Sequence, residues 1–142
     1  MKGVPLALTH NLKVNHVLHQ KVFLVAVETT EHPRVSDKDR VEVTSISDDV
    51  IRVVLRFGFM EQPDVPTGLK VGLSSGQIAA ADLESVTYYT GHETVIPTGL
   101  RPGMAPWRES LFAFMHHNAQ RPGAYFKIPS AQIMEIGIEF QI

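Results

Sequence analysis

The stretch after residue 55 constrains the fold most, because one kind of element ends there and another begins. Residues 50–55 are an apolar-rich run typical of a strand, and the residues that follow introduce a glycine, two aromatics and two prolines. Proline cannot donate to a sheet ladder, so the strand should end before Pro63. Asp64 is suited to cap a helix, and Pro66 suits its first turn. The chain is therefore predicted to pass from strand to helix here.

Size and composition indicate one globular domain. A chain of 142 residues fits a single domain and buries roughly two-thirds of its unfolded surface. A net charge of −2 gives no general attraction to nucleic acid. The absence of cysteine excludes disulfides and thiolate metal sites. Its longest apolar run, residues 22–27, is far below the roughly 20 residues that span a bilayer, so we expect a soluble chain that is not exported.

Several segments of the chain are predicted to be strands. Residues 21–29 are rich in β-branched side chains and predict a buried strand. Residues 41–46 and 50–57 flank a short polar turn and predict an antiparallel hairpin. Residues 85–90 predict a strand that ends at Gly91, with 93–96 pairing back on it. Residues 132–142 predict a closing strand whose apolar side chains share one face: Ile136, Ile138, Phe140 and Ile142.

Two segments predict helices, 64–75 and 106–118, and residues 4–19 fit either a short helix or an extended arm. This order of elements predicts an α/β (or α+β) fold. In it, a single-domain mixed β-sheet carries the two main helices. We expect residues 1–19 to be an N-terminal arm and residues 20–142 the globular core.

Several segments in order resemble the C-terminal hydrophilic domain of the Kup family of potassium uptake transporters. They are residues 4–13, 17–19, 33–35, 39–43, 56–66, 88–94, 103–104, 107–109, 111–113, 125–129 and 135–137. The residues that carry the signature, for which we expect structural roles, are Phe57, Gly58, Phe59, Met60, Glu61, Pro63, Trp107 and Gly137. The chain departs from the family pattern at Phe57, where tyrosine is common, at Val14 and His16, and in the glycines of its first main helix.

The resemblance implies that the parent protein is an integral membrane potassium transporter, a potassium–proton symporter. It also implies that this part lies at the cytoplasmic face of the cell membrane. Potassium ion and proton would be carried by membrane helices that this segment lacks, since intramembrane carboxylates and shielded oxygen sites belong there. The chain is then no enzyme, holds no cofactor and has a role in assembly or regulation. Its expected partners are the membrane domain of the same polypeptide, a second copy or a small anionic regulator, and not nucleic acid.

Three arginines are candidates for binding that regulator. Arg52 and Arg56 should point to the same side of their strand, and Arg40 should lie opposite them in the hairpin. A basic patch of this kind would suit a nucleotide or another small anion. The favoured interpretation is a solvated sheet face on which the arginines pair with cross-strand carboxylates such as Glu42.

Histidines and acidic residues give weaker signals. His10, His16 and His19 lie close in sequence, but no strong zinc pattern accompanies them, so capping or surface roles are favoured and no metal site is predicted. The adjacent His116 and His117 should point apart on a helix surface. The aspartate pairs at 37/39 and 48/49 are typical of turns rather than of acid–base catalysis.

Two further residues of the signature have a structural interpretation. Glu61 should accept hydrogen bonds from backbone amides at the start of the next helix, or pair with an arginine. Trp107 and the aromatics at 112 and 114 recur at helical spacing and most simply belong to a core. The alternative is that Trp107 or Phe112 serves an interface.

Overall fold

The computed structural model describes residues 4–96, 105–119 and 121–141, and of residues 92–96, 117 and 138–141 the backbone only. The helices are α1 Leu6–Asn15, α2 Asp37–Arg40, α3 Val65–Ser74, α4 Ala80–Leu83, α5 Pro106–His117 and α6 Pro122–Tyr125, with a 3₁₀ turn at Ser130–Gln132. The strands are β1 Val22–Thr30, β2 Val41–Ser45, β3 Val50–Gly58, β4 Tyr88–Ile96 and β5 Ile133–Gln141.

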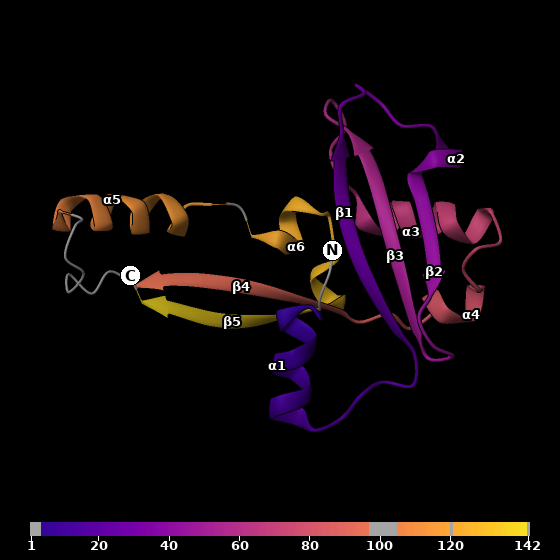
Figure 1. The fold of residues 1–142 in the computed structure, drawn as a ribbon, viewed down its shortest axis with the longest axis horizontal. Helices are drawn as coiled ribbons and strands as arrows, with labels where there is room; N and C mark the ends of the chain where they lie inside the picture. Colours follow the sequence, from indigo (N-terminus) through magenta and orange to yellow (C-terminus); the bar gives the residue numbers. More distant parts are fainter. Residues whose placement is uncertain (1–3, 97–104, 120, 142) are drawn as a thin grey trace.

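The first sheet has three strands in the order β1-β3-β2, with α3 across one face (Figure 1). β2 and β3 form the predicted antiparallel hairpin, in which Val41 lies opposite Leu55. β1 lies parallel to β3 along its whole length, from Val22 opposite Val50 to Thr30 opposite Gly58. β3 is therefore the central strand, and β1 is an edge strand.

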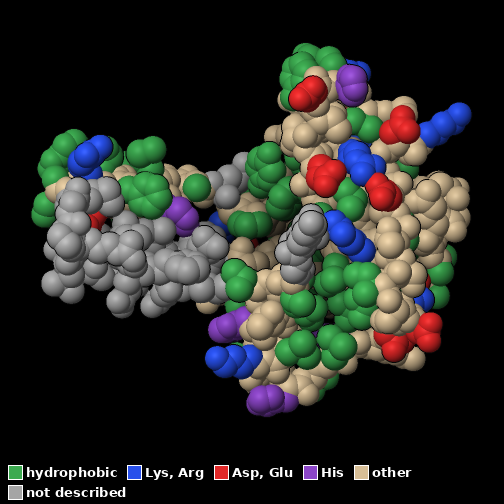
Figure 2. Space-filling model, in the orientation of Figure 1, with side chains coloured by type: hydrophobic (Ala, Val, Ile, Leu, Met, Phe, Trp, Pro, Cys, Tyr) green, Lys and Arg blue, Asp and Glu red, His purple; other side chains and the backbone are tan. Residues whose placement is uncertain are grey.

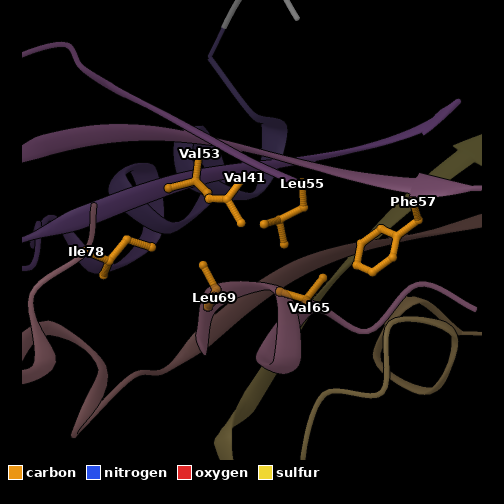
Figure 3. Close-up of a cluster of buried hydrophobic side chains, with 7 residues drawn as sticks. All are labelled: Val41, Val53, Leu55, Phe57, Val65, Leu69 and Ile78. Carbon is orange, nitrogen blue, oxygen red and sulfur yellow. The ribbon is translucent and has the colours of Figure 1, made fainter. Parts of the chain in front are cut away.

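The core lies between this sheet and α3 (Figure 3). Alternate residues of β3 point to the helix because side chains in a strand alternate between faces. Val53 and Leu55 have no exposed surface. The buried cluster consists of Val41, Val53, Leu55, Phe57, Val65, Leu69 and Ile78.

The helix α3 begins where the sequence predicts it. The carboxylate of Asp64 accepts a hydrogen bond from the Thr67 backbone N–H at 2.9 Å, which caps the first turn. The helix lies close to the sheet, since a Cβ at Gly68 would come within 3.0 Å of Leu55 Cδ1 on β3. Glycine here lowers helix propensity by about 1 kcal/mol against alanine, and it allows close packing in return.

The α/β class is confirmed, but the strands divide between two sheets instead of one. β4 and β5 form a separate two-stranded parallel sheet, which extends away from the first one together with α5 (Figure 1). The strand predicted to end at Gly91 continues to Ile96, so the predicted pairing of 93–96 back on 85–90 is wrong. Gly91 lies opposite Ile136 of β5, and the backbone ladder continues through it.

Two further segments refine the predictions. Residues 4–19 contain the short helix α1, which ends at His16 in a left-handed conformation (φ 54°) and lies near β4. The apolar strand β1 is only half-buried, although its composition predicted a buried strand. Its position at the edge of the sheet explains the difference, because an edge strand has a neighbour on one side only.

Candidate functional site

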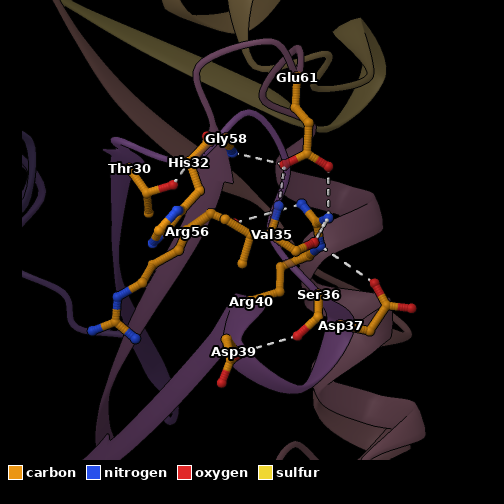
Figure 4. A network of polar contacts seen from close by, with 10 residues as sticks. All are labelled: Thr30, His32, Val35, Ser36, Asp37, Asp39, Arg40, Arg56, Gly58 and Glu61. Atoms are coloured by element: carbon orange, nitrogen blue, oxygen red, sulfur yellow. Dashed lines mark hydrogen bonds and ion pairs between the residues drawn. The ribbon is translucent and has the colours of Figure 1, made fainter.

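The signature that follows β3 forms a polar junction around the carboxylate of Glu61 (Figure 4). Glu61 Oε2 accepts hydrogen bonds from the backbone N–H groups of Gly58 at 2.7 Å and Val35 at 3.2 Å. These amides belong to the end of β3 and to the loop before α2, not to the start of α3 as the sequence suggested. The carboxylate thereby joins two segments that are 26 residues apart in the chain.

Arg40 completes the junction from α2. Its Nη2 atom donates to Glu61 Oε1 at 2.8 Å and to the Val35 carbonyl oxygen at 2.7 Å, so Glu61 has the arginine partner that the sequence allowed. The guanidinium also lies 5.0 Å from the centre of the Phe57 ring, a cation–π contact. Arg40 and the two backbone N–H donors lower the pKa of Glu61 to about 2, since each favours the ionised carboxylate.

The backbone of the junction leaves no room for side chains at its centre. A Cβ at Gly58 would lie 2.2 Å from the Pro33 carbonyl oxygen, so only glycine fits without a shift. Phe59 and Met60 donate backbone hydrogen bonds to the carbonyls of His32 and Pro33. Their side chains are exposed, while Pro63 is buried. The signature residues therefore fix the backbone between β3 and α3. Their hydrogen bonds and their ion pair have a structural role.

The three candidate arginines do not form one patch. Arg52 and Arg56 point to the sheet face opposite α3, whereas the guanidinium of Arg40 is held by Glu61. Arg56 pairs with Glu42 on β2 and with Glu28 on β1, the cross-strand arrangement favoured from the sequence. Acidic and basic side chains accordingly alternate over this part of the surface (Figure 2). Anion binding by Arg40, Arg52 and Arg56 stays a prediction.

The histidines lie apart. His10 and His16 are exposed, and His19 packs against the Tyr89 ring with centroids 5.7 Å apart. His116 contacts the Phe112 ring on α5. Within the described part of the chain, no three histidine or acidic residues come together as metal ligands.

The helix α5 presents its apolar side chains outward. Trp107 is 67% exposed, Phe114 65% and Met115 62%, and Leu111 and Phe112 are half-exposed. Glu109 on the opposite side is buried, with 1% exposed. The core interpretation of Trp107 is therefore wrong, and the interface interpretation remains. Figure 2 shows hydrophobic side chains gathered over this helix.

Gly137, the last signature residue, lies in β5 opposite His92. A Cβ there would have no atom within 4 Å, so packing does not require glycine at this position. Sequence reasoning also missed two parts of the junction, the Arg40–Phe57 contact and the use of the Val35 backbone. Both join residues brought together only by the fold, and no spacing in the sequence signals them.

The whole chain, residues 1–142, matches the family described as "K+ potassium transporter C-terminal domain". It belongs to this family. The chain is 45% identical over 141 residues to the probable potassium transport system protein Kup 3 of Bradyrhizobium diazoefficiens, and 44% identical over 141 residues to the Kup protein of Myxococcus xanthus. Each alignment covers 99% of this chain. The resemblance to Kup transporters drawn from the sequence is confirmed.

The alignments cover only 23% and 21% of those two relatives, so the chain spans about a fifth of the length of the curated relatives it matches. None of the helices in the described residues combines the length and the apolar composition needed to cross a bilayer. No solved structure matches this domain.

Proposed function

We propose that this Kup domain is a non-catalytic, cytoplasmic part of a potassium transporter, and that it docks on the membrane part of the same polypeptide through α5. The observation that carries the proposal is the apolar face of α5, formed by Trp107, Leu111, Phe114 and Met115, which stays open in a chain that spans a fifth of its relatives. Potassium and proton pass through the absent membrane part, and the domain acts on its assembly or regulation.

The composition of this face supports a protein partner. Aromatic residues and methionine are enriched at interfaces, and exposed apolar patches rimmed by polar residues mark interaction sites. The face has little charge to attract anionic lipid: on α5 Arg108 is basic, and the acidic Glu109 is buried away from the face. Packing against another apolar protein surface therefore suits it better than electrostatic attachment to a membrane.

Docking of this kind regulates transport only through a difference between states. A domain that makes the same contacts in every state of the transporter changes no equilibrium. If α5 packs against the membrane part better in one state than in another, the domain stabilises that state, and its coupling has a typical size of about 1–3 kcal/mol.

The test uses the full-length transporter that carries this domain, with Leu111→Ser and Phe114→Ser combined. We expect normal folding of the domain, because both side chains are at least half exposed, and a change in potassium uptake or in assembly of the transporter. The matched control is Ile46→Ser, which removes a 59% exposed side chain from the β2–β3 turn. Uptake and assembly that equal the wild type in the α5 variant would exclude docking through this face.

A further inference from the structure

A cavity of about 390 Å³ lies between α1, the edge strand β1 and β4. Its walls are mostly apolar side chains, among them Leu8, Leu18, Leu24 and Val86. The half-buried side chains of β1 contribute one wall, which accounts for an apolar strand at the edge of the sheet. Cavities of about 300–1,000 Å³ with apolar walls and a few polar groups are typical small-molecule sites. In Figure 2, hydrophobic side chains gather over α1 and the adjacent end of the first sheet.

Asn11 of α1 is a buried polar residue in this wall. It is 94% buried, since 6% of it is exposed, in a helix whose other described residues are mostly exposed. Its Oδ1 atom accepts a hydrogen bond from Asn15 Nδ2, and its amide is not among the buried groups of the described residues that lack a partner. The hydrogen bond of Asn11 therefore lies within α1 itself.

One polar atom of the cavity wall does lack a partner. Thr90 Oγ1 on β4 is shielded from solvent and has no hydrogen-bond partner among the described residues. Such an atom is unusual, because buried polar groups in native proteins are almost always hydrogen-bonded and leaving one unpaired costs about 1–3 kcal/mol. The pattern is that of a site whose ligand supplies the missing hydrogen bond.

The charge of the cavity selects an uncharged ligand. Lys21 Nζ lies 2.9 Å from both carboxylate oxygens of Asp82, so the two charges in the lining cancel. Burial, and then the nearby Asp64 carboxylate, raise the pKa of the Tyr88 hydroxyl, which keeps this wall neutral. His19 is held against the Tyr89 ring. Lys21 is paired with Asp82, so a phosphate or carboxylate ligand would find no unpaired positive charge at Lys21.

We propose that this cavity binds the hydrocarbon chain of an amphiphile with an uncharged oxygen in its head, an alcohol or an ester. The chain would fill the apolar part, and the oxygen would accept a hydrogen bond from the hydroxyl of Thr90. Two sources share this chemistry: a free amphiphile and the acyl ester of a membrane lipid. The site does not depend on docking through α5, which lies on another part of the molecule (Figure 1).

The first experiment titrates the 142-residue chain with octan-1-ol and follows backbone amide shifts by NMR. We expect saturable shifts in α1, β1 and β4, weaker binding of octanoate and no binding of inorganic phosphate. Thr90→Val removes the donor and keeps a β-branched side chain in the strand, so octan-1-ol should bind about 3- to 10-fold more weakly. His10→Leu on the exposed side of α1 is the control and should bind like the wild type.

A second variant tests the cavity rather than the donor. Ala7 lines the cavity from α1, and Ala7→Leu would occupy part of it without lowering helix propensity much. Octan-1-ol binding should be lost. Vesicles of phosphatidylcholine then distinguish the sources: co-sedimentation that Ala7→Leu abolishes identifies a membrane lipid, and binding of octan-1-ol alone identifies a free amphiphile. Absent or non-saturable octan-1-ol binding, equal affinity in Thr90→Val, or tighter binding of phosphate would overturn the proposal.

Discussion

The helices α3 and α5 are alike in sequence and opposite in their packing. Each has a proline at its start, Pro66 and Pro106, and each repeats apolar residues at helical spacing. α3 buries Val65 and Leu69 against the first sheet, whereas α5 exposes Leu111 and Phe114 and buries Glu109. Apolar periodicity thus predicts that a helix forms and which residues share a face, but not whether the same chain covers that face.

The largest expected loss of stability is in the core between α3 and the first sheet, and it tests the difference in packing between α3 and α5. Leu55→Ala should destabilise the domain by about 2–5 kcal/mol, because the side chain has no exposed surface and truncation leaves a cavity. Leu111→Ala on α5 should change stability by no more than about 0.5 kcal/mol. Urea unfolding of both variants measures the difference. Equal losses would mean that α5 also contributes to the core.

The next effect compares two glycines of the signature, one in each sheet. Gly58→Ala should destabilise by about 1–3 kcal/mol, because the new Cβ would lie 2.2 Å from the backbone oxygen of Pro33. Gly137→Ala in β5 meets no atom within 4 Å, and it should be neutral or stabilise by up to about 1 kcal/mol. Thermal unfolding of both variants measures their changes in stability. A loss of stability in Gly137→Ala equal to that in Gly58→Ala would contradict the expected difference between the two positions.

A smaller effect concerns pH and the Glu61 junction. The folded pKa of Glu61, about 2, lies below its ordinary value of 4.5, so its contribution is complete above about pH 4.5 and is lost as pH falls toward 2. Glu61→Gln should cost about 1–2 kcal/mol at pH 7 and reduce this acid dependence.

Urea unfolding at pH 7 and pH 3 tests the junction. Glu84→Gln, at an exposed carboxylate after α4, serves as the control for loss of one negative charge. A Glu61→Gln variant that loses as much stability between these pH values as the wild type would show that other carboxylates dominate the acid transition.

The smallest effect on stability is expected on α5 itself. Trp107→Ser should leave the unfolding free energy of the domain within about 0.5 kcal/mol of the wild type, because the side chain is 67% exposed. It should also lower retention of the domain on a hydrophobic column. Circular dichroism during urea unfolding checks the first expectation. A loss of several kcal/mol would place Trp107 in a core after all.

Local signals in the sequence predicted the first sheet well. The hairpin and the helix after it follow from alternation, a polar turn and the Asp64 cap, all of which act over a few residues. The sequence shows the family signature but not its structural role. That role depends on the hydrogen bond between Val35 and Glu61, which are brought together only by folding.

The errors share a physical cause, since each concerned what packs on an element rather than the element itself. The composition of β1 predicts an interior strand, yet β1 is an edge strand beside a cavity. Gly91 predicts the end of a strand, yet the ladder with β5 continues through it. Strand pairing and helix coverage depend on distant parts of the chain, which neither propensity nor periodicity encodes.

The central place of β3 sets an order for assembly. Its antiparallel neighbour is joined by a four-residue turn, at residues 46–49, so this pairing closes quickly. Its parallel neighbour starts 28 residues earlier, from Val22 to Val50, and must bring a longer loop together before any contact forms. Until then, the backbone N–H and C=O groups on one side of β3 are unpaired. A strand of another molecule can pair with them during this interval.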